Sequence, residues 1–236
     1  MIIIHKALLA EQIAQAIRHL IFSGQLISGS KIPQDQLAEQ FGVSRMPIRE
    51  ALAMLNFEGL VMIEPRRGAR VARLSLQSID ESYTLREWLE SKAVELSVPL
   101  LSHEDLVQLR RQYETMEKSG IPQNSDVFVA ANYEFHRVLR SRCPWPKLST
   151  IVETLWKGFP PLAPQFVHQQ IAHDRQEHYQ LLLVAEQHNG SHAAHLMGEH
   201  VHRSWEMARN YFRDLGWSDS GSPVPTSDQE ASHANN

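Results

Sequence analysis

The sequence is almost free of cysteine and contains no long hydrophobic run. Cys143 is the single cysteine among 236 residues, which excludes an intrachain disulfide framework and favours a reducing compartment. No stretch reaches the roughly 18 consecutive apolar residues that a membrane-spanning helix needs. The four apolar residues at the start are followed by His5 and Lys6 instead of a longer signal-like segment. These absences predict a soluble, cytoplasmic protein without a membrane partner.

The chain also lacks the net positive charge that is typical of nucleic-acid-binding proteins, because its formal net charge is −4. That charge is unevenly distributed: residues 1–75 contain nine lysines and arginines against six acidic residues, a net charge of +3, and the remainder carries −7. Nine of the thirteen histidines lie between His136 and His202. Since 42% of the residues are hydrophobic, both parts can form a core, and the composition predicts two domains with different tasks.

Residues 1–74 carry the pattern of three helices followed by a β-hairpin. Apolar residues recur at helical spacing over 6–23 and about 34–41, and a third helix is predicted from Arg45 onward. Ser44 is a suitable N-cap residue for this helix, and Pro47 then falls in its first turn, where backbone N–H groups have no intrahelical partner. Residues 60–63 and 70–73 are predicted strands, joined by a turn at "PRRG". This order predicts a winged helix-turn-helix domain.

Arginines stand at the two places where such a domain meets DNA. Arg45 and Arg49 lie one turn apart at the front of the third helix, and their forked guanidinium groups suit phosphate oxygens and the O6/N7 edge of guanine. Arg66 and Arg67 occupy the tip of the hairpin. Paired arginines on a helix more often belong to a solvated surface. Their combination with tight helix spacing and a basic hairpin favours a DNA-reading element.

The second half of the chain shows helical periodicity almost throughout. It predicts an all-α bundle of about six helices, at 79–101, 103–118, 126–141, 145–159, 165–189 and 191–215. We expect a linker at 75–78, a helical domain at 79–216 and a disordered polar tail at 217–236. The dipeptide Asn189-Gly190 is the expected stop between the last two helices. The predicted fold class is therefore mainly α, with an N-terminal winged helix-turn-helix followed by a helical bundle.

Three histidines and one asparagine of the helical domain are candidates for a metal site. Asn132 and His136 are four residues apart and project from the same side of one helix. His178 and His200 lie 11 and 10 residues from the Asn189-Gly190 turn, so they stand at about the same height in an antiparallel helix pair. Thirteen histidines also produce chance clusters, and we keep His173 as a reserve candidate. A surface or core role without metal is expected for His188, His192, His195 and His202.

The segment "LAEQFGVSRMPIREALAMLNFEGLV", with "RRGARV" after it, resembles the DNA-binding domain of the GntR family of bacterial transcription regulators over residues 6–73. The resemblance implies that the third helix and the wing contact an operator. The expected DNA-contacting residues are Ser44, Arg45, Met46, Arg49, Arg66, Arg67 and Gly68. The sequence departs from the family pattern at two positions, since Asp35 stands where members often carry an arginine and Met46 replaces a more usual small hydroxyl residue.

The helical half resembles the FCD-type domain of the FadR-like subfamily over residues 76–215. This resemblance implies a divalent metal, Zn²⁺ or another transition metal such as Ni²⁺. The implied ligands are His136, His178 and His200, with Asn132 as a weaker ligand. The resemblance also implies that Arg86 binds an effector, expected to be a small organic acid, although a surface role for this arginine is equally open.

Together these features predict a metabolite-responsive, DNA-binding transcription regulator, in this family most commonly a repressor. A single DNA-binding domain of net charge +3 makes few contacts with DNA phosphates. Two domains bound to two half-sites double the number of these contacts, so we expect a homodimer on a palindromic operator. A metal-dependent enzyme with an accessory basic domain is the alternative, but the sequence contains no HExxH motif that would place a general base beside the metal. A third possibility keeps the DNA role and makes the metal purely structural.

Overall fold

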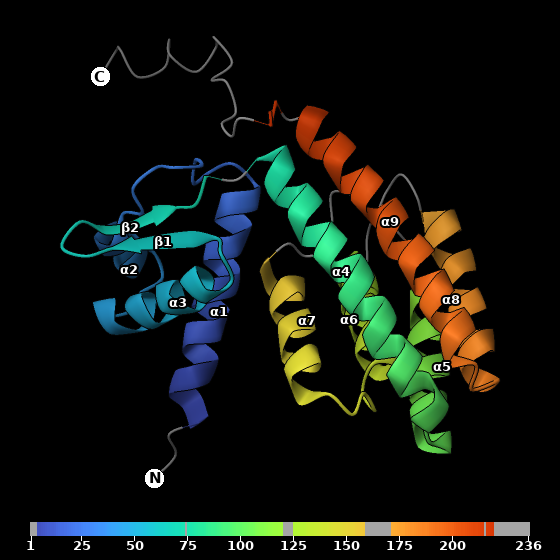
Figure 1. Cartoon of the computed structure of the whole chain (residues 1–236). Coiled ribbons are helices and arrows are strands. Elements are labelled where there is room, and N and C mark those ends of the chain that lie inside the picture. The colour runs from blue at the N-terminus through green and yellow to red at the C-terminus, as the bar shows by residue number, and fades with distance from the viewer. Residues whose placement is uncertain (1–3, 74, 120–124, 159–170, 215, 220–236) are drawn as a thin grey trace. The chain divides into compact units, whose positions relative to one another are not determined.

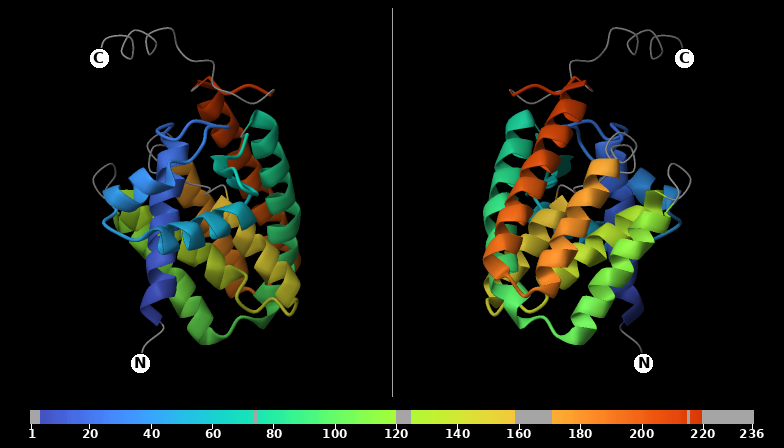
Figure 2. Two further views of the ribbon diagram at one scale, coloured as in Figure 1. Left: turned by 90° about the vertical axis from the view of Figure 1, so that its left-hand side faces the viewer. Right: turned by 90° about the vertical axis from the view of Figure 1, so that its right-hand side faces the viewer.

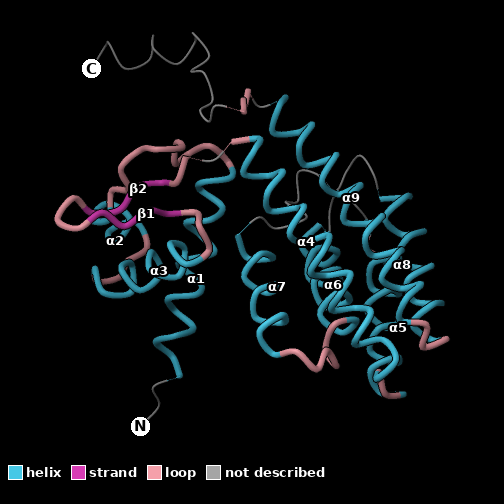
Figure 3. The backbone as a smooth tube through the Cα atoms, viewed as in Figure 1, coloured by secondary structure: helices cyan, strands magenta, loops and turns pink. Residues whose placement is uncertain are grey.

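The computed structural model describes residues 4–73, 75–119, 125–158, 171–214 and 216–219, and it is mainly helical (Figures 1 and 3). It divides into two compact units, formed by Met1–Ser78 with Phe212–Asn236 and by Ile79–Tyr211. Within the described ranges, none of the helices has both the length and the apolar character that crossing a bilayer requires. The predicted fold class, a winged helix-turn-helix followed by an all-α bundle, is confirmed.

The first unit contains the predicted winged helix-turn-helix. Its elements are α1 (Ile4–Phe22), α2 (Gln34–Gln40), α3 (Arg45–Phe57), β1 (Val61–Glu64) and β2 (Gly68–Val71). The two strands are antiparallel, with Val61 opposite Val71. The core of the unit is made by the apolar stripes of the helices, including Ile13, Ile17, Ile48, Leu52 and Leu55, each at most 4% exposed. The guanidinium of Arg18 in α1 donates to both carboxylate oxygens of Glu58, at 2.7 and 2.9 Å, and so ties α1 to the end of α3.

The second unit is the predicted helical bundle. Its elements are α4 (Leu76–Ser97, of which the first residues belong to the first unit), a short 3₁₀ helix η1 (Val98–Leu100), α5 (His103–Lys118), α6 (Ser125–Leu139), α7 (Pro146–Gly158), α8 (Ile171–Glu186) and α9 (Gly190–Asp214). In Figures 1 and 2, α8 and α9 run side by side. The predicted capping pattern at the start of α5 is confirmed, since Asp105 N–H donates to Ser102 Oγ at 3.2 Å and Ser102 N–H donates to Asp105 Oδ2 at 2.8 Å.

The expected linker at 75–78 is for the most part helical. Leu76 already begins α4, because Ser75 and Ser78 cap the helix start reciprocally. The Ser78 backbone N–H donates to Ser75 Oγ at 3.1 Å, and the Ser75 backbone N–H donates to Ser78 Oγ at 3.3 Å. The residues of the expected linker therefore start a helix.

The expected disordered tail at 217–236 begins with ordered contacts. The ring of Trp217 lies 4.4 Å from the ring of Phe212 between centroids, and Ser218 accepts a backbone hydrogen bond from Leu76 at 3.2 Å. The apolar Trp217 side chain gains from this packing, which a purely polar tail does not offer. Residues 220–236 of the expected tail lie outside the described residues.

The turn between α8 and α9 differs from the predicted stop at Asn189-Gly190. His188, with φ 54°, is the residue in the left-handed conformation. Asn189 starts the next helix, because its side-chain oxygen accepts a hydrogen bond from the His192 backbone N–H at 3.1 Å. Gly190 is the first residue of α9 and is needed for another reason. A Cβ atom there would lie 2.3 Å from the carbonyl oxygen of Glu95.

We expect Gly190→Ala to lower the free energy of unfolding by about 3 kcal/mol, because the added methyl group meets a backbone carbonyl that cannot rotate away. The midpoint of urea denaturation measures the effect. Gly198→Ala in the same helix is the matched control, since its Cβ would lie 3.3 Å from the rotatable Oγ of Ser91. That variant is expected to be close to neutral, and equal midpoints for the two variants would contradict the assigned role of Gly190.

Candidate DNA interface and metal centre

The start of α3 presents its polar residues to solvent. Ser44, Arg45, Met46 and Arg49 are all exposed, whereas Pro47 is buried among the core residues. Ser44 occupies the N-cap position, as predicted, but its side chain makes no capping hydrogen bond. The third helical residue, which often donates to an N-cap side chain, is here the proline, which has no backbone N–H. The serine hydroxyl is therefore not committed to capping the helix.

Arg45 forms an ion pair with Asp35 of α2, with 2.5 Å between Nε and Oδ1. Their side chains are 72% and 66% exposed, and ion pairs at such exposure contribute little to stability. Asp35, which stands where family members often carry an arginine, thus pairs its carboxylate with the guanidinium of Arg45, a predicted DNA contact. The arginine can exchange this partner for a phosphate or a base at small cost.

The wing completes a basic groove with α2 and α3. Arg66 and Arg67 are exposed in the turn between β1 and β2, where Arg66 adopts a φ of 64° and Gly68 a φ of 92°. A groove of about 960 Å³ lies between this turn and the exposed start of α3. Its basic lining residues are Lys31, Arg45, Arg49, Arg66 and Arg67, and its acidic ones are Asp35 and Glu64. The excess of positive charge suits the phosphate backbone of DNA.

The three candidate histidines converge although they come from three helices. His136 of α6, His178 of α8 and His200 of α9 are buried, and one ring nitrogen from each lies within 4.8 Å of the others. His136 Nε2 and His178 Nε2 are 3.2 Å apart. Ligand nitrogens about 3.3 Å apart follow from tetrahedral geometry with Zn–N bonds of about 2.0–2.1 Å. The spacing of the His136–His178 pair therefore fits a transition-metal ion, and the His200 ring nitrogen lies within 4.8 Å of both.

The protonation state of His136 also suits metal binding. Burial lowers the pKa of His136 well below its ordinary value of 6.5, and the nearby His200 and His178 lower it further. Neutral imidazole is the form that binds a metal. Glu177 Oε2 lies 2.8 Å from His200 Nδ1, an arrangement that orients a histidine ring and leaves the other nitrogen for the metal.

Asn132 lies one turn before His136 on α6, as the sequence predicts. Its side chain belongs to a residue only 2% exposed, and its Oδ1 atom is buried with no hydrogen-bond partner among the described residues. An unpartnered buried carbonyl oxygen is costly unless a cation or a donor satisfies it. The donor set of three imidazoles and one amide oxygen thus fits a divalent ion, and its role as a metal site remains a prediction.

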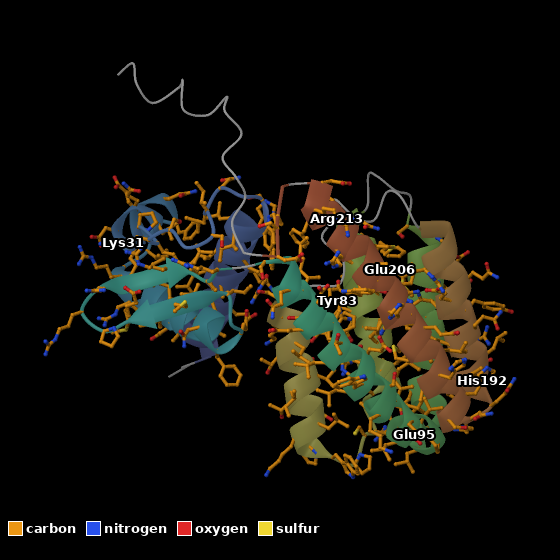
Figure 4. The ribbon with its side chains drawn as sticks, turned by 45° about the horizontal axis from the view of Figure 1, so that its top comes forward. Lys31, Tyr83, Glu95, His192, Glu206 and Arg213 are labelled. Carbon is orange, nitrogen blue, oxygen red and sulfur yellow. The ribbon has the colours of Figure 1, made fainter. Side chains whose placement is uncertain are left out.

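Four further histidines of this region are expected to have a role without metal. His188, His192, His195 and His202 are exposed, and Figure 4 shows His192 on the outside of the helical unit. The side chain of His173, the reserve candidate, lies outside the described residues.

Arg86 is buried inside the helical unit, so the alternative of a surface role is wrong. It is 1% exposed, and its Nε donates to Glu90 Oε1 at 2.7 Å, one turn further along α4. The guanidinium carbon lies 4.7 Å from the centroid of the Trp156 ring, and Nη1 is buried without a hydrogen-bond partner in the described part of the chain. Because the ring of His136 is 4.8 Å from the same Trp156 ring, Arg86 lies close to the histidine cluster.

Sequence reasoning missed three neighbours of the cluster: Glu90, Arg140 and Trp156. Two of them carried a signal. Glu90 follows Arg86 by four residues, the spacing of a helical ion pair. Arg140 follows His136 by four residues, the spacing that also connects Asn132 with His136. Trp156 had no such signal, because it belongs to another helix, α7, and its distance from His136 depends on how α7 packs against α6.

Comparisons with known proteins agree with both halves of the structure. Residues 9–71 match the family described as bacterial regulatory proteins, gntR family, and residues 81–203 match the FCD domain. The chain is 36% identical over 129 residues to the uncharacterized HTH-type transcriptional regulator YdhC of Bacillus subtilis, and this match covers 54% of the chain and 58% of YdhC.

Two further relatives are regulators as well. The HTH-type transcriptional regulator McbR of Escherichia coli is 28% identical over 178 residues, covering 74% of the chain and 80% of McbR. A solved structure of McbR superimposes with a TM-score of 0.68 at 23% identity, covering 86% of the chain and 98% of that structure, which supports the fold. The gluconate operon transcriptional repressor of Bacillus subtilis is 28% identical over 162 residues, covering 69% of the chain and 65% of the repressor.

The chain therefore spans 58% of the first of these curated relatives, YdhC, and larger shares of the other two. Matched domains and relatives alike are transcription regulators, which confirms the prediction that the chain is not an enzyme. With the FCD match spanning about half of the chain and the gntR match preceding it, the chain belongs to the gntR family of bacterial regulatory proteins, in the branch that carries an FCD domain.

Proposed function

We propose that this regulator is a cytoplasmic repressor that binds a palindromic operator as a homodimer and leaves it when a small organic acid binds to a metal-containing site in the helical unit. The observation that carries the proposal is the position of the buried Arg86 guanidinium beside the candidate metal ligands. One relative is by name a repressor of the gluconate operon. The steps of the proposal rest on separate features of the two units.

The DNA-binding step rests on the exposed face of the first unit. Arg45, Arg49 and the wing arginines surround one groove, and the proposed contacts also include Ser44, Met46 and Gly68. Residues 1–75 carry a net charge of only +3. A single copy therefore makes few phosphate contacts, and two copies on an inverted repeat raise both affinity and specificity. This is the physical reason for proposing a homodimer and a palindromic operator.

The effector-binding step rests on the second unit. His136, His178, His200 and Asn132 would hold the divalent ion, which supplies a positive charge and open coordination positions for an anionic ligand when it is bound. Imidazole donors suit Zn²⁺, and they also suit Ni²⁺ or Cu²⁺. The buried Nη1 of Arg86 is a charged donor for a carboxylate at the same place. The carboxylate of a small organic acid can bind both the metal ion and the Arg86 guanidinium.

The switch requires that the effector binds more tightly to the DNA-incompetent arrangement than to the competent one. The same coupling then makes the operator weaken effector binding by an equal factor. Selection from random duplexes identifies an operator, and gel-shift titration with the metal-loaded full chain tests the coupling. We expect the selected site to be an inverted repeat and one class of carboxylic acid to weaken operator binding. Selected duplexes without two-fold symmetry, or acids that bind without any change in operator affinity, would contradict the proposal.

Chelation separates the proposed sensory metal from a purely structural one. If the metal takes part in sensing, its removal abolishes the response to the acid. A structural metal would change the melting temperature and leave the effector response of the remaining folded protein intact.

A further inference from the structure

A second buried guanidinium lies beside the candidate metal centre. Arg140 is 5% exposed, and its Nη2 donates to Glu153 Oε2 at 2.9 Å. Its Nη1 is buried and finds no hydrogen-bond partner among the residues that the structure describes. A buried charged donor without a partner is costly. Arg140 thus has the same incomplete environment as Arg86.

Trp156 connects the two arginines with the histidines. Its ring centroid lies 4.7 Å from the guanidinium carbon of Arg86, 5.1 Å from that of Arg140 and 4.8 Å from the ring centroid of His136. The indole Nε1 of Trp156 is also buried, again with no partner in the described ranges. Two charged groups with an unpartnered donor therefore lie over the Trp156 ring, and the ring's own Nε1 is a third such donor next to the histidine cluster.

The charges at this place leave a divalent ion uncompensated. Glu90 pairs with Arg86 and Glu153 pairs with Arg140, so each guanidinium already has one carboxylate. The carboxylate of Glu177 beside His200 is paired with Arg203. The expected metal ligands are neutral, because Asn132 supplies an amide oxygen and imidazole binds a metal in its neutral form. Two positive charges from the metal then remain in a buried site, where unpaired charge is strongly unfavourable. A ligand with two negative charges neutralises them.

We propose that the effector is a dicarboxylate, and that Arg140 and Trp156 form the subsite for its second carboxylate. The first carboxylate lies beside the histidines and Arg86, and the second accepts hydrogen bonds from Arg140 Nη1 and Trp156 Nε1. This inference rests on the proposed function, which requires only an anionic effector. It further specifies that the effector carries two carboxylates and that Arg140 binds the second one.

The test compares acids of equal length that carry one or two carboxylates. Isothermal titration of the zinc-loaded full chain with succinate, butyrate, glutarate, valerate and inorganic phosphate measures each affinity. We expect one of the dicarboxylates to bind at least about tenfold more tightly than its monocarboxylate partner, because it gains a charged hydrogen-bonding group. Equal affinities within both pairs, or tightest binding of phosphate, would overturn the dicarboxylate inference alone. If neither dicarboxylate binds, the dicarboxylate inference fails, whereas the proposed function fails only if carboxylic acids leave operator affinity unchanged.

Arg140→Gln tests the subsite directly, with melting temperature and zinc content as checks on folding. The variant should lose about tenfold in dicarboxylate affinity and keep its monocarboxylate affinity, since only the second carboxylate contacts Arg140. A purely structural arginine would change both affinities together. That outcome would overturn the assignment.

Glu153→Gln gives an independent answer if Arg140→Gln does not fold. It removes the carboxylate that pairs with Arg140 and keeps the shape of a side chain that is 34% exposed. Arg140 then has no carboxylate partner that competes with the ligand. Dicarboxylates should therefore bind several-fold more tightly, while the affinity for monocarboxylates is unaffected. Unchanged or weaker dicarboxylate binding in this variant would contradict the subsite.

Discussion

The double variant Arg45→Ala/Arg49→Ala is expected to bind its operator at least about 100-fold more weakly than the unchanged chain at constant salt. A bidentate contact between an arginine and guanine contributes about 1–3 kcal/mol, and a dimer loses it in both half-sites. Both side chains are exposed at the start of α3, whose buried face is formed by other residues, so the fold should persist. Gel-shift titration measures the loss, and an unchanged melting temperature verifies folding.

The matched control removes the same number of charges from the other unit. Arg111 and Lys147 are exposed on α5 and α7, and their double replacement by alanine should leave operator affinity within about twofold. If this control weakens binding as strongly as the recognition-helix variant, the effect is one of total charge and the assignment of α3 is wrong.

Asp35→Asn should act in the opposite direction. The change removes the carboxylate that pairs with Arg45 and that lies in the basic groove. Both side chains are largely exposed, so the fold loses little. Operator affinity is then expected to rise several-fold at low salt, and the rise should diminish as salt screens the charge. A fall in affinity would instead indicate that Asp35 holds the arginine in its reading position.

The second large effect is expected from His178→Ala. The histidine is 1% exposed, and its Nε2 lies 3.2 Å from His136 Nε2, so its loss opens the centre of the ligand set. We expect metal content to fall from about one ion per chain to a small fraction. A metal present at about 1,000 times its Kd stabilises the fold by about 4 kcal/mol. At roughly 2–4 °C per kcal/mol for a protein of this size, the melting temperature should drop by about 10 °C.

His195→Ala is the control for this experiment, because His195 is an exposed histidine on α9 and belongs to the same residue type. It should retain both the metal and the melting temperature. Elemental analysis and thermal melting before and after chelation provide the measurements. If His178→Ala and the unchanged chain have the same metal content and the same response to chelator, the three histidines are not ligands.

The winged helix-turn-helix could be predicted almost completely because its signals are local. Apolar spacing, a proline in the first turn of α3 and a glycine-containing hairpin turn all act within a few neighbouring residues. The structure differs from the expectations at two helix starts. Ser75 and Ser78 lie in the expected linker at 75–78, and in the structure they cap the start of α4. Asn189 suggests a helix end and in the structure begins the next helix.

The histidine cluster could be predicted for a similar reason. The four-residue step between Asn132 and His136 is a property of one helix, and the distances of His178 and His200 from their common turn compare two helices joined by a short connection. The structure brings the three rings to centroid distances of 4.7–5.2 Å, in agreement with that reasoning.

The sequence by itself determined the order of the elements, the nature of the two units and the three histidines, because each follows from spacing within a helix or across one turn. Only the tertiary structure decided which other polar groups share the buried site. Glu90 and Trp156 reach it from α4 and α7, and there they meet Arg140 at the end of α6. Their proximity depends on how these helices pack against one another. That packing is determined by how the side chains of residues far apart in the sequence fit together.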